Sequence, residues 1–161
     1  MRKLVLSGKG ILTGEGSLLA LKDLKYERAL LVTGGSSMIK SGVIARAEKY
    51  LQMNGTETDL FSGVPKNPSI EDVLKGLVIC RKFKPDVILA IGGGSAMDCA
   101  KAILLFYEFP YLNFENVLEF NKKGEIPTER KTGLICVPST SGTGSEVTRG
   151  TVISDPEKEL K

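Results

Sequence analysis

The sequence predicts an α/β fold with a doubly wound, mostly parallel sheet, and two observations lead to that prediction. First, short apolar runs of strand length alternate with longer segments whose apolar residues recur at helical spacing. Second, the most hydrophobic run, residues 86–91 (DVILAI), lacks polar alternation, as expected of a strand buried on both faces. Strands that alternate with helices form βαβ units with right-handed crossovers, and such units build a parallel sheet.

The expected elements can be placed in order along the chain. Strands are expected at residues 29–32, 57–61, 86–91 and 133–137, with a further β-like segment at 147–153. Helices are expected at residues 38–53, 69–83 and 95–106. Ser69, with Asp72 three residues later, has the spacing of a capping box that begins the second helix. The final segment, ISDPEKELK, is typical of a turn that opens a hairpin, so we expect this chain to be one domain of a longer protein.

Composition limits the function classes. A length of 161 residues suits one domain with its own core, and 42% hydrophobic with 25% charged residues is ordinary for a globular protein. The net charge of +3 is scattered in ones and twos, which argues against a nucleic-acid partner. The N-terminus lacks the apolar core of a signal peptide, and no apolar run approaches the roughly 20 residues of a membrane span. A cytoplasmic protein without a membrane partner is expected.

The counts of cysteine and histidine limit the chemistry that this chain can perform. The three cysteines, Cys80, Cys99 and Cys136, form no CxxC pair and lie in apolar segments, which predicts buried, reduced thiols. Histidine, the commonest metal ligand and general base near neutral pH, does not occur in the sequence. A histidine-dependent catalytic step is therefore excluded for these 161 residues.

The strongest candidate site is the glycine turn Gly92, Gly93, Gly94 and Ser95, between the most hydrophobic strand and a helix. Glycines at a helix N-terminus leave backbone N–H groups accessible to a phosphate and add the positive end of the helix dipole. Open α/β sheets bind ligands at this position. The alternative is a tight turn in which glycine only permits unusual dihedral angles, but three consecutive glycines exceed what a turn needs.

Two further loops follow predicted strands. Residues 138–146 (PSTSGTGSE) carry five hydroxyls and two glycines, which suit phosphate and ribose oxygens better than a flexible linker. The segment Gly34, Gly35, Ser36 and Ser37 offers room and donors without a carboxylate, and Lys40 adds positive charge. This arrangement suits the 2′-phosphate of NADP, whereas a carboxylate would bind the 2′-OH of NAD. A plain turn remains the alternative for this segment.

Ser95 and Asp98 allow two interpretations. Their S-x-x-D spacing is that of a capping box, and this structural role stands beside a ligand role. Lys101, three residues after Asp98, would pair with it on the helix surface, where an ion pair contributes little to stability.

Four motifs, in this order and spacing, are similar to those of one enzyme family: VTGGSS, VPKNPS, AIGGGSAMDCAK and PSTSGTGSEVT. Together they resemble the iron-containing (group III) alcohol dehydrogenases along nearly the whole chain. The related dehydroquinate synthase and glycerol dehydrogenase branches share the glycine turn, but the GTGSEVT ending resembles the alcohol dehydrogenase branch. The resemblance implies a Rossmann-like, dehydroquinate synthase-like N-terminal domain over residues 1–161 that binds a nicotinamide dinucleotide. A helical domain that binds iron or zinc would be absent from this chain.

The resemblance also assigns residues of this sequence to the cofactor site. The pyrophosphate would be held by Gly93, Gly94 and Ser95, and the other side of the cleft would be lined by Ser139, Thr140 and Thr143. Asn67 would lie beside the cofactor, Asp98 near the nicotinamide, and both Thr148 and Lys161 near the nicotinamide ribose. Gly34 stands where NAD-preferring members carry aspartate, so NADP is the expected cofactor and NAD the alternative.

For the whole protein, the resemblance implies reversible oxidation of a primary alcohol or diol to an aldehyde or ketone. Hydride would pass to the nicotinamide while a metal stabilises the alkoxide. This chain alone would be inactive and holds no nominated metal ligand, and the protein would be a homo-oligomer. The alternatives are a nucleotide-binding module without catalysis and a glycerol dehydrogenase-like branch. The isolated domain should expose the apolar wall of its cleft and self-associate.

Overall fold

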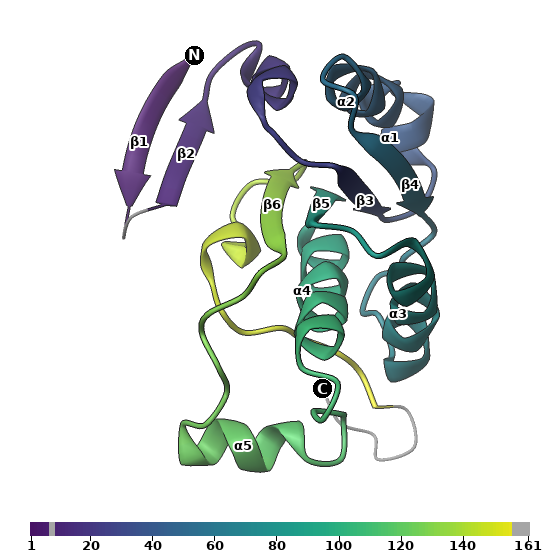
Figure 1. The fold of residues 1–161 in the computed structure, drawn as a ribbon, viewed down its shortest axis with the longest axis vertical. Coiled ribbons are helices and arrows are strands. Elements are labelled where there is room, and N and C mark those ends of the chain that lie inside the picture. Colours follow the sequence, from purple (N-terminus) through teal and green to yellow (C-terminus); the bar gives the residue numbers. More distant parts are fainter. Residues whose placement is uncertain (7–8, 156–161) are drawn as a thin grey trace.

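The fold is a parallel sheet with helices on both faces, seen in a computed structural model that describes residues 1–6 and 9–155. The strands of this sheet are β3 (Arg28–Thr33), β4 (Glu57–Phe61), β5 (Val87–Gly92) and β6 (Gly133–Pro138). They lie side by side in the order β4-β3-β5-β6, and every neighbouring pair is parallel (Figure 1). The predicted doubly wound α/β sheet is confirmed.

The helices divide between the two faces of the sheet. In the described part of the chain they are α1 (Ser37–Lys40), α2 (Val43–Gln52), α3 (Ile70–Phe83), α4 (Gly94–Glu108) and α5 (Val117–Lys123), with 3₁₀ helices η1 (Ser17–Asp23) and η2 (Ser145–Val147). Helices α3 and α4 pack together on one face, whereas α2 and η1 cover the other (Figure 1).

The strand β5 and the middle of β3, residues 29–32, are apolar because each strand contributes to two cores. Leu30 and Ile88 belong to the core formed with α3 and α4, whereas Leu31 and Leu89 belong to the core formed with α2 and η1. All four side chains are almost completely buried. Burial on both faces thus explains the lack of polar alternation that the sequence shows in these strands.

The predicted single helix at residues 38–53 is wrong. The segment forms two helices, α1 and α2, separated by Gly42, whose φ of 73° lies in the left-handed region. A residue in that conformation ends the first helix and caps the second, and glycine adopts it without strain. The helical spacing of the apolar residues is nevertheless kept, because Ile44, Ala47 and Leu51 of α2 are buried against the sheet.

Three parts of the chain differ from the sequence analysis or were absent from it. An antiparallel hairpin of β1 (Arg2–Leu6) and β2 (Lys9–Thr13) stands apart from the main sheet (Figure 1). Helix α5, between α4 and β6, is not among the helices expected from the sequence. The β-like segment predicted at 147–153 is wrong: after η2 the chain is irregular up to Ile153, and Ser154 then forms a bridge with Ser69.

The cysteines are free thiols, as predicted. Cys80 and Cys99 are buried, and burial raises the pKa of each thiol to about 12. Cys136 on the edge strand β6 is only half-buried, which corrects the expectation of full burial, although burial still raises its pKa. Within the described ranges, no helix is long and apolar enough to cross a bilayer.

Candidate functional site

The candidate site lies where the winding of the sheet changes direction. β4 and β5 flank β3 on opposite sides, so the loops that leave β3 and β5 at their carboxyl ends diverge and frame a crevice. The two loops are adjacent, because a Cβ built on Gly92 would lie 3.8 Å from the backbone N of Gly34. The buried Thr33 hydroxyl ties them together by donating to the Ile91 carbonyl at 2.7 Å. Two sequence-predicted segments therefore meet at this edge.

The start of helix α4 faces this crevice. Gly93 is its N-cap residue in an extended conformation, and no side chain caps the helix. The N–H groups of the first turn of a helix lack intrahelical partners and carry the positive end of the dipole. An anion is therefore favoured beside Gly93 and Gly94, which agrees with the phosphate role predicted for the glycine turn.

The predicted capping box of Ser95 and Asp98 is wrong. Helix α4 begins at Gly94, so Ser95 lies inside the first turn and not at the cap. Its Oγ accepts a hydrogen bond from the backbone N of Asn67 at 3.3 Å. Asn67 has a left-handed φ of 54°, so a sharp bend carries this loop to the glycine turn, as expected for a residue beside the site.

The hydroxyl-rich loop after β6 forms the other wall. The backbone N of Ser139 donates to the Gly92 carbonyl at 2.8 Å, which holds the start of this loop against the glycine turn. A Cβ on Gly93 would lie 3.3 Å from Oγ1 of Thr140, and one on Gly94 would lie 3.4 Å from Cβ of Thr143. A Cβ at Gly93 would crowd Thr140, and one at Gly94 would be in contact with Thr143, so the two glycines let this loop lie close to the start of α4.

The loop after β3 forms the third wall. Gly34 accepts a backbone hydrogen bond from Gly63, and a Cβ on Gly34 would lie 3.4 Å from the Val64 carbonyl oxygen. Gly35, Ser36 and Ser37 continue from it as an exposed stretch at the start of α1. Among the described residues, no atom lies within 4 Å of a Cβ built on Gly35, and two hydroxyl groups follow it in the chain.

The side chains of Asp98 and Thr148 are both bound by Lys101. Lys101 forms an ion pair with Asp98 at 3.2 Å and donates to Oγ1 of Thr148 at 3.2 Å. The side chains of Lys101 and Asp98 are 7% and 13% exposed, so the predicted pair exists but its predicted place on the helix surface is wrong. Sequence analysis missed this role of Lys101. The signal was a charged pair inside a helix whose other residues are mostly apolar.

The structure thus brings together most of the predicted site residues. The residues around the crevice are Gly34, Asn67, Gly92, Gly93, Gly94, Ser95, Ser139, Thr140 and Thr143. Asp98 and Thr148 lie farther along α4, joined through Lys101. Gly35, Ser36 and Ser37 are exposed in the loop after β3, and Lys161 lies outside the described residues.

The glycines and hydroxyls of this crevice fit a dinucleotide, because a phosphate needs a helix start without side chains in its way. They do not fit a catalytic metal. Among residues 1–6 and 9–155, no group of three or more Cys, Asp or Glu side chains is placed to hold a metal ion, and the sequence contains no histidine. No chemical step of this chain is therefore assigned to a metal.

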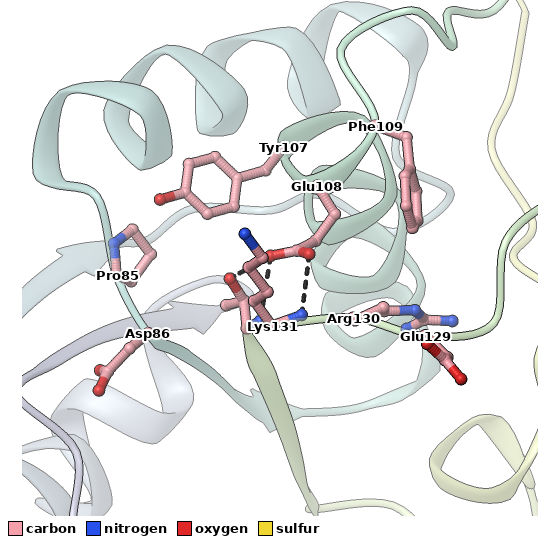
Figure 2. A pocket seen from close by; sticks show the side chains of 9 residues that line it. Pro85, Asp86, Tyr107, Glu108, Phe109, Glu129, Arg130 and Lys131 are labelled. Atoms are coloured by element: carbon pink, nitrogen blue, oxygen red, sulfur yellow. Dashed lines mark hydrogen bonds between the residues drawn. The ribbon is translucent and has the colours of Figure 1, made fainter.

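A separate hollow of about 780 Å³ opens at the opposite, amino edge of the sheet (Figure 2). Two of its carboxylates, those of Asp86 and Glu108, are engaged by the chain itself. Glu108 accepts hydrogen bonds from the backbone N of Lys131 and of Thr132, each at 3.0 Å, and from the Thr132 hydroxyl. Asp86 accepts from the backbone N of Arg28 at 2.9 Å. These acids stabilise loops, and we do not assign a ligand to this hollow.

Comparison with known proteins gives a consistent set of relatives. The family model described as iron-containing alcohol dehydrogenase matches residues 5–161. An NADPH-dependent butanol dehydrogenase of Clostridium saccharobutylicum is 42% identical over 153 residues, which is 95% of this chain and 39% of that protein. An alcohol dehydrogenase of Thermococcus barophilus is 41% identical over 147 residues, which is 89% of this chain and 39% of that protein. The chain therefore spans about two fifths of the length of these relatives.

Solved structures show the same fold. The iron-containing alcohol dehydrogenase of Thermococcus thioreducens superposes with a TM-score of 0.75 at 39% identity, covering 92% of this chain and 42% of that one. A 1,3-propanediol oxidoreductase superposes with a TM-score of 0.75 at 29% identity, covering 91% of this chain and 38% of that one.

Proposed function

Because the chain belongs to the iron-containing alcohol dehydrogenase family, we propose that it forms the dinucleotide-binding part of an alcohol dehydrogenase that uses NADP. One observation carries the proposal: the uncapped start of α4 lies at the switch point of the sheet, between the loops after β3 and β6. Dinucleotides bind at such a crevice in open α/β sheets.

The pyrophosphate would lie over the glycine turn. The backbone N–H groups of Gly94 and Ser95 at the start of α4 would donate to its oxygens, with the helix dipole adding to the attraction. From the wall after β6, Ser139, Thr140 and Thr143 add hydroxyl groups that can donate to phosphate or ribose oxygens. Gly92 and Gly93 keep side chains away from the path of the cofactor.

The adenosine end would lie against the loop after β3. A carboxylate there would repel a 2′-phosphate, whereas Gly34, Ser36 and Ser37 bring donors and no negative charge. Lys40 at the end of α1 adds a positive charge nearby in the chain. The NADPH-dependent butanol dehydrogenase among the relatives supports the same choice of cofactor.

The activity of the whole protein would be oxidation of an alcohol, or reduction of the corresponding aldehyde or ketone. The bound nicotinamide supplies the hydride acceptor, and these residues bind and orient it. Because the described residues do not fit a metal, the ligands of a catalytic iron or zinc would come from outside residues 1–6 and 9–155. This chain by itself would bind the dinucleotide without turnover.

The proposal is tested by titrating the chain with NADPH and with NADH while nicotinamide fluorescence is recorded. Tighter binding of NADPH is expected. Gly34→Asp should reverse the preference, since a carboxylate would meet the 2′-phosphate, and its Cβ has only the Val64 carbonyl as a close neighbour, at 3.4 Å. Gly10→Asp places the same charge in the N-terminal hairpin and should leave the preference unchanged. NADH preference by the wild type would contradict the choice of NADP, and no binding of either would contradict a dinucleotide site in this chain.

A further inference from the structure

The segment after the hydroxyl-rich loop is held against α4 by side chains. We call residues 144–152 the strap. It contains η2 and then an irregular stretch, so over most of its length no regular backbone ladder fixes its position. Two residues of α4, Asp98 and Lys101, make the polar contacts that hold it.

Lys101 makes three of these contacts. Its ammonium group donates to the Gly150 carbonyl at 2.8 Å, to the Thr148 carbonyl at 3.3 Å and to the Thr148 hydroxyl at 3.2 Å. A lysine ammonium has three donors, and here each has an oxygen of the strap within reach. The paired Asp98 carboxylate lies 3.2 Å from the same nitrogen.

Asp98 binds the strap at one residue before and one residue after those that Lys101 contacts. One carboxylate oxygen accepts from the Ser145 hydroxyl at 2.6 Å, and the other accepts from the backbone N of Val152 at 3.1 Å. Together the two residues hold the strap at positions 145, 148, 150 and 152. All these partners lie on a segment about fifty positions later in the sequence.

The strap is connected to the candidate site at both ends. At its start, the backbone N of Ser145 donates to Oγ1 of Thr143 at 3.4 Å, and Thr143 lies against the helix start at Gly94. Beyond its end, the backbone N of Ser154 donates to the Pro68 carbonyl at 2.9 Å, next to Asn67. A shift of the strap would therefore move groups on two walls of the crevice.

The strap lies on the opposite side of the crevice from the proposed position of the adenosine. The adenosine end is assigned to the loop after β3, whereas the strap follows β6, on the opposite side of β5. A dinucleotide whose pyrophosphate lies at the start of α4 would extend its other half toward the strap.

We propose that Lys101 is a positioning residue of the dinucleotide site, which fixes the strap so that Thr143 and Thr148 meet the nicotinamide half of the cofactor. The inference rests on the proposed function. Burying an ammonium and a carboxylate is unfavourable unless both are paired and fully hydrogen-bonded. Apolar side chains of similar volume at these two positions would stabilise the packing of α4 equally well. Here the hydrogen bonds of the buried pair favour one position of the strap over others.

The test compares Lys101→Met with wild type. Methionine keeps the length of the side chain and removes its charge and donors. The Kd for NADPH should rise about tenfold, which corresponds to about 1.4 kcal/mol. The Kd for adenosine 2′,5′-bisphosphate, which lacks the nicotinamide half, should stay unchanged. General damage to the fold would weaken both ligands, so the difference between them identifies positioning.

The matched control is Lys75→Met on α3. Lys75 also pairs with a carboxylate on its own helix, Glu71 at 2.9 Å, but the two side chains are 60% and 77% exposed. This variant should leave both Kd values unchanged. If Lys101→Met does not fold, the double variant Asp98→Asn with Lys101→Met leaves no unpaired buried charge, and the same difference between the two ligands is expected.

Hydrogen exchange measured without ligand provides a second readout. In Lys101→Met the strap amides, including that of Val152, should exchange faster, while amides of β3 and β5 remain as protected as in wild type. Unchanged exchange of the strap, or equal losses for the two ligands, would overturn the inference. A wild-type chain that binds no nucleotide would overturn the proposed function as well, whereas normal wild-type binding with an unchanged NADPH Kd in Lys101→Met would overturn the inference alone.

Discussion

The two edges of the central sheet are both polar, but their polar groups are used differently. At the amino edge the carboxylates of Asp86 and Glu108 accept hydrogen bonds from backbone N–H groups of neighbouring loops. At the carboxyl edge the helix start at Gly93 has no side-chain cap and is surrounded by glycines and threonines. The two carboxylates at the first edge are hydrogen-bonded within the chain, whereas the second edge offers donors to an anion.

This difference shows why a hollow is not by itself a binding site. The hollow of about 780 Å³ lies at the amino edge, where the acids already stabilise the protein (Figure 2). The proposed dinucleotide site lies at the other edge, where the geometry of the helix start and the glycines matters more than enclosed volume. Substitutions at the two edges should therefore separate stability from cofactor affinity.

The largest effect on affinity is expected from Gly93→Val. The side chain would stand between the N–H groups of α4 and the phosphate, and its Cβ would lie 3.3 Å from Oγ1 of Thr140. The Kd for NADPH should rise about 100-fold, which corresponds to about 2.8 kcal/mol, measured by fluorescence titration. Gly133→Ala at the amino edge, whose Cβ would lie 2.9 Å from the Tyr26 hydroxyl, should reduce stability and leave the Kd unchanged. Wild-type affinity in Gly93→Val would refute the pyrophosphate position.

Glu108→Gln should have the opposite profile. A neutral amide accepts weaker hydrogen bonds from Lys131 and Thr132 than a carboxylate does, so the free energy of unfolding should fall by about 1–2 kcal/mol in urea denaturation. The Kd for NADPH should not change. A loss of affinity without a loss of stability would show that the amino edge belongs to the site.

A smaller, matched effect compares one hydroxyl at each edge. Thr140→Val removes a hydroxyl beside the glycine turn and should weaken NADPH binding by about 0.5–1.5 kcal/mol. Thr132→Val removes the hydroxyl that donates to Glu108 and should lower the free energy of unfolding instead. If both variants changed stability alone, Thr140 would have no part in cofactor binding.

The smallest effect concerns pH. Burial raises the pKa of Glu108, but hydrogen bonds from Thr132 and Lys131 outweigh it, so the pKa lies below its ordinary value of 4.5. A lowered pKa in the folded protein contributes stability that is present above pH 4.5 and is lost as the pH falls through the folded pKa. Wild type should therefore lose more unfolding free energy than Glu108→Gln between about pH 6 and pH 3, measured by urea titrations. Equal losses would contradict the lowered pKa.

Identical spacing at two places shows how far local sequence predicts structure. Ser69 and Asp72 form the predicted capping box, with the Ser69 backbone N donating to Asp72 at 2.8 Å. Ser95 and Asp98 have the same spacing, but β5 runs through glycine directly into α4, so the helix begins before Ser95. Asp98 then bonds the strap instead of the helix start. The spacing alone does not distinguish these outcomes.

Four of the predicted strands and two of the three predicted helices were correct because their signals are local. The strand predicted at 86–91 is β5 (Val87–Gly92), and the helix predicted at 69–83 is α3 (Ile70–Phe83). The hairpin of β1 and β2 was missed, since its short strands leave a weak apolar pattern in the sequence. The strand expected at 147–153 is absent because the side chains of α4 hold that segment in an irregular conformation.

The sequence by itself determined the succession of the four strands of the central sheet and of helices α3 and α4, and with it the parallel sheet and the glycine turn at the carboxyl end of β5. Apolar periodicity and backbone freedom act over a few neighbouring residues, so they can be read along the chain. Only the tertiary structure decided which polar side chains remain for a ligand. Asp98 and Lys101 were expected on a helix surface, but they are buried because the strap, 47 to 54 positions away in the sequence, lies over them.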